Sequence, residues 1–186
     1  MKHDDMIKTV TEVGLAVDEK LRILKHVIEP EQKTGKEKRI CVVTGTHGDE
    51  LEGQYVCYEL NRIIKEHKEH LKGIVEIYPA LNPLGVDSIS RGIPMFDLDM
   101  NRIFPGNEEG SVAEHVAAKI VGDIAGADLC IDIHASNIFL REIPQARVNV
   151  NTKETLLPFA TRLNLDFVWV HAAATVLEST LAHSLN

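Results

Sequence analysis

The chain has 186 residues, of which 44% are hydrophobic and 26% are charged, and its formal net charge at pH 7 is −8. This composition is typical of a globular protein with a proper core and excludes a disordered chain. The acidic balance argues against nucleic-acid binding, which needs a basic face. No run approaches the ~18 apolar residues of a membrane span, and no apolar secretory stretch opens the sequence. We therefore expect a cytoplasmic protein without a membrane partner.

The first part of the chain predicts a β-hairpin followed by a linker. Over residues 12–28, EVGLAV and LRILKHVI flank a turn at Asp18-Glu19, and the second run alternates apolar and polar residues. The stretch 29–39 is charged and broken by proline and glycine, so it predicts a surface loop. We expect residues 1–39 to form a hairpin and linker packed on a main domain, which spans residues 40–186.

Short apolar runs alternate with helical segments through the main domain. The runs ICVVT (40–44), IVEIYPA (74–80) and LCIDI (129–133) predict strands buried on both faces. Helices are expected at about 50–70, from the capping box Ser111-x-x-Glu114 to about 125, and at about 153–164, followed by a strand over 166–170. This order predicts a three-layer α/β/α fold with a mostly parallel, mixed sheet.

Two of the expected strands are followed by residues of types that can bind metals. His47 and Glu50 follow the run 40–44, and their spacing puts both side chains on one side of a turn flanked by Gly45 and Gly48. His134 follows the run 129–133. If the two strands are neighbours, the three side chains converge at the carboxyl edge of the sheet, where ligands bind. Two imidazoles and a carboxylate form a catalytic type of zinc site, although either histidine alone is more often structural.

Three segments resemble motifs of the succinylglutamate desuccinylase and aspartoacylase family, relatives of zinc carboxypeptidases. They are VVTGTHGDELEGQ, DLDMNRIFPG and DLCIDIHAS, in matching order and spacing over about residues 40 to 140. The resemblance implies a carboxypeptidase-like fold and one Zn²⁺ per chain, held by His47, Glu50 and His134. It also implies that Asn101 and Arg102 hold a substrate carboxylate. Arg91 would polarise the scissile carbonyl and stabilise the oxyanion.

Other polar residues receive weaker assignments. Asp132 lies two residues before His134, so it is either an acceptor that orients the imidazole or a carboxylate capped by backbone at the strand end. Asp97 and Asp99 are expected to be structural or solvated. His171 and His183 are expected at the surface. The three cysteines form no CxxC pair, and Cys41 and Cys130 lie in apolar runs, which predicts buried free thiols.

The general base of the family is missing from the expected pattern. The family uses a glutamate well downstream of the second histidine, in a buried strand and usually followed by x-Gly. Glu142, Glu154 and Glu178 do not fit that pattern, so none is assigned. The last residues, HAAATVLESTLAHSLN, predict a helix cut short, and family members are longer. We therefore expect a truncated chain.

These observations predict a zinc-dependent hydrolase that cleaves the amide bond of a small N-acyl amino acid or a similar carboxylate-bearing amide. Two alternatives stay open. One is a zinc carboxypeptidase acting on peptides. The other is a chain that binds metal or substrate without catalysis, because the base is absent. The exposed edges of an incomplete sheet would favour a homo-oligomer.

Overall fold

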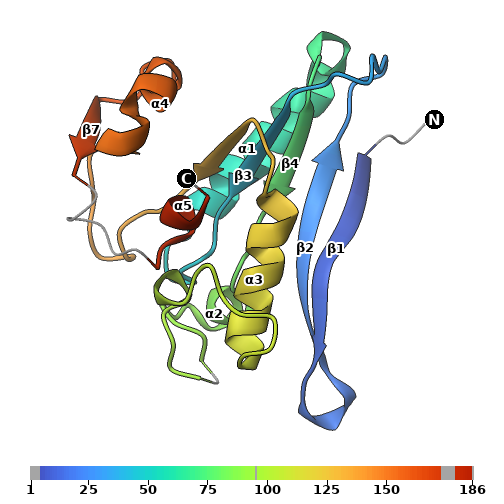
Figure 1. Cartoon of the computed structure of the whole chain (residues 1–186), viewed down its shortest axis with the longest axis vertical. Coiled ribbons are helices and arrows are strands. Elements are labelled where there is room, and N and C mark those ends of the chain that lie inside the picture. Colours follow the sequence, from blue (N-terminus) through green and yellow to red (C-terminus); the bar gives the residue numbers. More distant parts are fainter. Residues whose placement is uncertain (1–4, 95, 173–178, 186) are drawn as a thin grey trace.

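A five-stranded mixed sheet forms the centre of the molecule (Figure 1). The computed structural model describes residues 5–94, 96–172 and 179–185. The order of the strands across the sheet is β1-β2-β4-β3-β5. Their bounds are Asp5–Gly14 for β1, Lys20–Ile28 for β2, Arg39–Val43 for β3, Ile74–Tyr78 for β4 and Leu129–Asp132 for β5.

The N-terminal hairpin is longer than expected and is part of this sheet. β1 begins at Asp5 instead of residue 12, and the chain turns through a short 3-10 helix, Ala16–Asp18. A register shift between Thr9 and Thr11 interrupts the alternation of β1, which explains why its pattern is hard to read from the sequence. β2 pairs antiparallel with β4. The division of the chain at residue 39 stays a prediction; both parts contribute to one sheet.

Within the larger sheet, β3, β4 and β5 run parallel to one another, with β3 in the middle. Val43 of β3 lies opposite Tyr78 of β4 on one side and Asp132 of β5 on the other. The strands that precede His47 and His134 are therefore neighbours, as their convergence on one site requires. Because parallel strands end at the same edge, the loops that follow them meet there.

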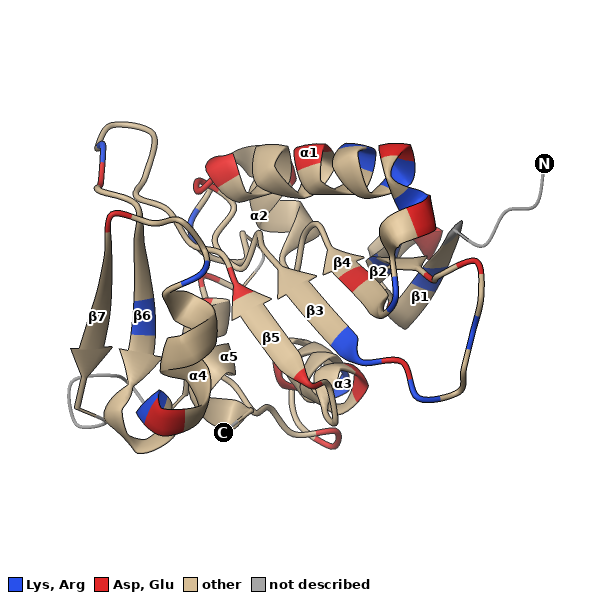
Figure 2. Cartoon of the chain, turned by 90° about the horizontal axis from the view of Figure 1, so that it is seen from above, with Lys and Arg blue, Asp and Glu red and all other residues tan. Residues whose placement is uncertain are grey.

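Helices cover both faces of the sheet, which makes the expected three layers (Figure 2). α1 (Glu52–Glu66) lies on one face and α3 (Val112–Ile124) on the other. The capping box of Ser111 and Glu114 is present at the start of α3. The alternation of β3 matches these layers: Cys41 and Val43 belong to the core cluster under α3, and Val42 belongs to the cluster under α1.

The helical spacing of α1 does not tell which of its faces is buried. Tyr55 and Tyr58 are 67% and 62% exposed, whereas Gly53 and Cys57 are buried against the sheet. A glycine at 53 permits this contact, since a Cβ there would lie 1.8 Å from Thr44 Oγ1. All three cysteines are free thiols; Cys41 and Cys57 are buried, and Cys130 is half-buried.

The long segment 82–110 contains two short helical elements. α2 (Pro83–Ser88) is capped by Asn82, whose side chain accepts a hydrogen bond from Gly85 N. A 3-10 turn spans Met100–Arg102, with the side chain of Asp99 as its cap. Within the described residues, no helix has the length and apolarity that a bilayer span requires.

The C-terminal part forms a second, smaller sheet. β6 (Gln145–Asn149) pairs in parallel with β7 (Phe167–His171), and α4 (Lys153–Ala160) connects them. β6 was not expected, and α4 ends earlier than residue 164. A helix was expected over the tail from residue 171, but His171 belongs to β7, and the described residues 179–185 hold only the short helix α5 (Leu181–Ser184). Residues 173–178 lie outside the described residues.

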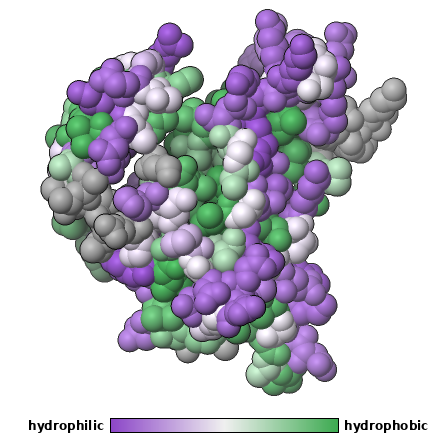
Figure 3. All heavy atoms as spheres, in the orientation of Figure 1, coloured by the Kyte–Doolittle hydropathy of each residue, from purple (hydrophilic) through white to green (hydrophobic). Residues whose placement is uncertain are grey.

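Apolar side chains remain exposed around this smaller sheet. Phe159, Phe167 and Trp169 are each more than 40% exposed. Figure 3 shows hydrophobic atoms in the recess between this part and the main sheet. β5 is an edge strand of the larger sheet. The expected self-association stays a prediction.

Candidate metal and substrate site

The loop after β3 is held in place by the loop after β4. Leu81 N donates to Thr44 O, and Asn82 N donates to Gly45 O, so the two loops continue the pairing of their strands. Gly45 has a φ of +69°, which a side chain would disfavour. A Cβ on Gly48 would lie 1.9 Å from the carbonyl carbon of Gly85, so the loop packs directly on the backbone of α2.

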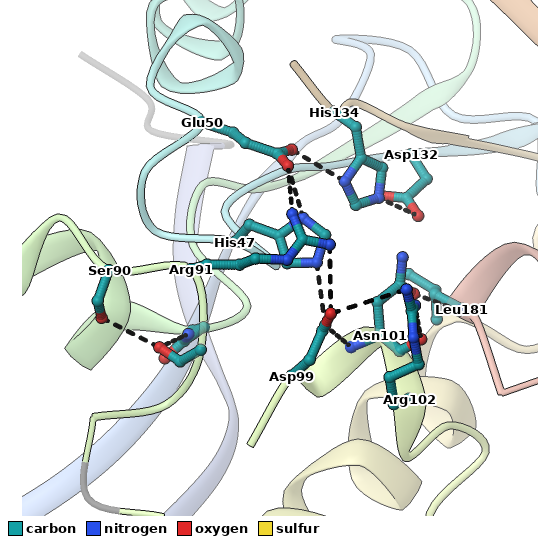
Figure 4. A network of polar contacts seen from close by, with 12 residues as sticks. His47, Glu50, Ser90, Arg91, Asp99, Asn101, Arg102, Asp132, His134 and Leu181 are labelled. Carbon is teal, nitrogen blue, oxygen red and sulfur yellow. Dashed lines mark hydrogen bonds and ion pairs between the residues drawn. The ribbon is translucent and has the colours of Figure 1, made fainter. Parts of the chain in front are cut away.

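His47, Glu50 and His134 converge at the carboxyl edge of the sheet (Figure 4). One ligand atom from each lies within 4.8 Å of the other two. The Nδ1 atoms of His47 and His134 lie 2.7 and 3.0 Å from the two carboxylate oxygens of Glu50. Ala135 N also donates to Glu50. The carboxylate therefore lies between the two imidazoles, which are 5.0 Å apart at their ring centroids.

The outer nitrogen of each imidazole contacts a second carboxylate. His47 Nε2 lies 3.0 Å from Asp99 Oδ1, and His134 Nε2 lies 3.1 Å from Asp132 Oδ2. A carboxylate at this nitrogen holds the proton there and leaves Nδ1 available to a metal. Asp132 was expected to be either an acceptor that orients the imidazole or a carboxylate capped by backbone, and its side chain contacts the imidazole of His134.

Asp99 was expected to be structural or solvated, but its carboxylate contacts other candidate site residues. In addition to its contact with His47, the carboxylate of Asp99 accepts a hydrogen bond from Asn101 N at 2.9 Å and lies 3.2 Å from Arg91 Nη2. The one sequence signal was that Asp99 stands two residues before Asn101, as Asp132 stands two residues before His134. Asp97 is exposed and lies outside this network.

The two arginines border the same group of carboxylates. Arg91 Nη1 lies 3.4 Å from Glu50 Oε1, so this guanidinium spans Glu50 and Asp99. Arg102 Nη1 donates a hydrogen bond to the backbone oxygen of Asn101 at 2.8 Å. The side chains of Arg91 and Arg102 are 50% and 44% exposed, which leaves both available to a small anionic ligand.

The pKa values describe a site with ionised carboxylates. Burial would raise the pKa of Glu50, but hydrogen bonds from His134 and His47 outweigh it and hold this pKa well below its usual range. Burial likewise raises the pKa of Asp99, and His47 and Asn101 N lower it further than burial raises it. Burial lowers the pKa of His134, but Asp132 and Glu50 bring it to about 10. This concentration of negative charge suits a divalent cation.

The remaining titratable candidates lie elsewhere. Glu142 and Glu154 are exposed on a loop and on α4, and Glu178 lies outside the described residues. His171 is half-buried beside Trp169, with its ring centroid 5.9 Å from the indole. His183 is also half-buried, and its Nδ1 is a buried atom. Both histidines, which were expected at the surface, are thus partly exposed, and His183 lies on α5, which contacts β5 of the larger sheet.

Comparison with known families agrees with the motifs. Residues 36–184 match the family model described as the succinylglutamate desuccinylase/aspartoacylase catalytic domain. The chain belongs to this family. The resemblance carried by the three motifs is thereby confirmed, and the members that this chain matches include hydrolytic, deacylating enzymes.

Individual relatives show how much of the family's length is present. An N-alpha-acetyl-L-2,4-diaminobutyric acid deacetylase from Halomonas elongata is 31% identical over 119 residues, which are 63% of this chain and 34% of that protein. The structure of a succinylglutamate desuccinylase/aspartoacylase from Rhodobacter sphaeroides is 21% identical, with a TM-score of 0.79. The match covers 97% of this chain and 53% of the chain in that structure. This family member thus spans about a third of the length of the curated relative and about half of the solved one.

The carboxypeptidase-like fold expected for the family is also confirmed. A metallo-carboxypeptidase from Burkholderia cenocepacia is 13% identical, with a TM-score of 0.67, over 96% of this chain and 51% of that structure. At this identity the likeness concerns the fold alone. The fold therefore places the candidate metal ligands, which follow β3 and β5, at one edge of the mixed sheet.

Proposed function

We propose that this chain acts in the zinc-dependent hydrolysis of the amide bond of a small N-acyl amino acid. The observation that carries the proposal is the convergence of His47, Glu50 and His134 within 4.8 Å, with a carboxylate behind each imidazole. Family membership supports the reaction class, since the curated relative is named as a deacetylase of an acetylated amino acid.

The donor set fits a catalytic zinc ion. Two imidazole nitrogens and one carboxylate oxygen are the ligands of many hydrolytic zinc sites, and they leave a position for water or substrate. Zinc, when bound, supplies Lewis acidity and lowers the pKa of a bound water to about 7. The chain's own contribution is to orient the ligands. Asp99 and Asp132 hold the Nε2 protons of His47 and His134, so that both rings present Nδ1.

The arginines supply the positive charge that a carboxylate-bearing substrate requires. Arg102 and the amide of Asn101 are proposed to bind the substrate carboxylate, because a guanidinium matches that group with two parallel hydrogen bonds. Arg91 is proposed to donate to the oxyanion that develops at the scissile carbonyl. Its position between Glu50 and Asp99 keeps the guanidinium beside the metal ligands.

One observation favours a second function, metal and substrate binding without catalysis. In the described part of the chain, no glutamate besides Glu50 contacts His47, His134 or Arg91. Glu50 is assigned to the metal, so no general base is assigned. Turnover therefore separates the two functions: the hydrolase requires product release, whereas the binding chain requires only saturable ligand binding.

The test measures zinc content first and turnover second. We expect about one zinc per chain, and loss of stoichiometric zinc in His47→Ala and in His134→Ala by elemental analysis. His70→Ala, at an exposed histidine in a 3-10 turn, is the matched control and should keep its zinc. Unchanged zinc in both site variants would overturn the ligand assignment.

Turnover is then assayed with N-alpha-acetyl-L-2,4-diaminobutyric acid, N-succinylglutamate and short peptides. Release of the acyl group supports the hydrolase, and Arg102→Ala should mainly raise KM. Preference for peptides would instead identify a carboxypeptidase. Saturable binding of the acyl amino acids with no turnover would favour the binding function.

A further inference from the structure

The carboxamide of Asn101 is held by a residue 80 positions further along the chain. Asn101 Oδ1 accepts a hydrogen bond from the backbone N–H of Leu181 at 3.1 Å. Asn101 is 8% exposed and Leu181 is fully buried, so water competes little for this bond. Figure 4 shows Leu181 beside Asn101 and Arg102, at the border of the candidate substrate site.

This contact decides which end of the amide is left for a ligand. The backbone N–H of Asn101 donates to Asp99, and its backbone oxygen accepts from Arg102. With Oδ1 bound to Leu181, Nδ2 is the side-chain atom that remains, and it can only donate. A carboxylate accepts such a hydrogen bond. A flipped amide would present an oxygen instead, which would repel a carboxylate and accept from a carboxamide.

Leu181 is itself firmly placed. Its side chain lies in the core cluster that includes Tyr78, Met100 and Phe104. It is the first residue of α5, where a backbone N–H has no partner within the helix and is free for another acceptor. Thr180 caps the helix by accepting from His183 N. The position of the N–H is therefore set by core packing and by the capped turn.

We propose that Leu181 is a positioning residue that determines specificity: its backbone N–H orients Asn101 so that the site selects a ligand with a free carboxylate over the corresponding carboxamide. The inference rests on the proposed role of Asn101 and Arg102 in substrate binding. It adds a second segment of the chain, α5, to the recognition of the substrate.

Replacing Leu181 by proline removes the N–H and leaves the backbone shape intact. Proline is favoured at the first position of a helix. Thr180 has a ψ of 154°, which is the extended conformation that a residue before proline prefers. Leu181→Val is the matched control, because valine has as many side-chain carbons as proline but keeps the N–H.

The measurement is the dissociation constant of the zinc-loaded chain for L-2,4-diaminobutyric acid, the deacetylated product that keeps the carboxylate, and for its carboxamide, by calorimetry. We expect the unmodified chain and Leu181→Val to prefer the acid. Leu181→Pro should lose about tenfold of that preference, the equivalent of one hydrogen bond to a charged group. In an Asn101→Ala background the proline should have no further effect.

The outcomes separate the inference from the function on which it rests. An unmodified chain that binds acid and carboxamide equally would overturn the proposed carboxylate site, and the inference with it. A clear preference that survives equally in Leu181→Pro and Leu181→Val would overturn the role of Leu181 alone. If the proline variant does not fold, Thr180→Ala loosens the same turn, with Thr180→Ser as its control. A preference weakened by Thr180→Ala supports the role, and an unchanged one contradicts it.

Discussion

At the scale of single residues, Asp99 links parts of the site that are far apart in the sequence. Its Oδ1 lies near His47 Nε2 and accepts a hydrogen bond from Asn101 N. Its Oδ2 lies near Arg91 Nη2. A candidate metal ligand, a candidate oxyanion donor and a candidate substrate residue thus share one carboxylate. Removing its charge should disturb all three without disturbing the core.

The substitution Asp99→Asn tests this link. The amide keeps the size of the side chain but loses the charge that holds the proton on His47 Nε2, so zinc affinity should fall by about 10–100-fold. A competition titration with a chromogenic chelator measures the affinity. Asp97→Asn, at the exposed neighbour, should bind zinc as the unmodified chain does. Equal affinities in the two variants would show that Asp99 does not act on the metal ligands.

At the scale of elements, the loop that carries the candidate metal ligands His47 and Glu50 depends on close backbone contact with α2. Gly48 N donates to Ser90 O, and a Cβ at position 48 would overlap the backbone of Gly85 and Val86. The loops after β3 and β4 are therefore placed by contact between main chains, and a side chain at this point would push them apart. His47, directly before Gly48, would move with the loop.

Two alanine substitutions compare this glycine with one in open space. Gly48→Ala should destabilise the fold by about 1–3 kcal/mol, the usual cost of an overpacked position. Gly122→Ala, inside α3, meets nothing within 4 Å and should stabilise by about 0.5–1 kcal/mol. Urea denaturation gives both free energies of unfolding. A change of stability in the same direction in both variants would contradict the close packing of Gly48.

At the scale of the whole molecule, two thiols are buried on opposite faces of the sheet. Cys41 belongs to the core under α3, and Cys57 belongs to the core under α1. Burial raises the pKa of Cys57 from 9.0 to about 11, and burial with the neighbouring Glu76 carboxylate does the same for Cys41. Both thiols stay protonated in the folded chain at a pH where the unfolded chain has begun to lose these protons.

This difference predicts a loss of stability at alkaline pH. Below pH 9 the contribution of the two thiols is fully present, and it declines as the pH rises from 9 towards 11, because the unfolded chain binds fewer protons there. Urea denaturation at pH 8 and at pH 10.5 should show the decline. A Cys41→Ala, Cys57→Ala variant should show a shallower one, and an identical slope in both proteins would contradict the prediction.

The family, the fold class and the candidate metal ligands could all be predicted from the amino-acid sequence. Continuous apolar runs, a capping box and the spacing of His47 and Glu50 are local patterns, and the physics behind them acts within a few residues. The length of the N-terminal hairpin was not predicted, because the bulge in β1 interrupts the alternation of apolar and polar residues from which a strand is predicted. β6 was not predicted either, because its residues QARVN contain no continuous apolar run of the kind found in β3 and β5.

Which distant residues meet could be seen only in the folded chain. Folding placed β3 between β4 and β5, turned Tyr55 and Tyr58 of α1 outward, and brought Asp99 to His47. It also joined Leu181 to Asn101. These contacts join residues many positions apart in the chain and leave no periodic trace in the sequence. They follow from the order of the strands and from packing at the edge of the sheet, which exist only once the chain has folded.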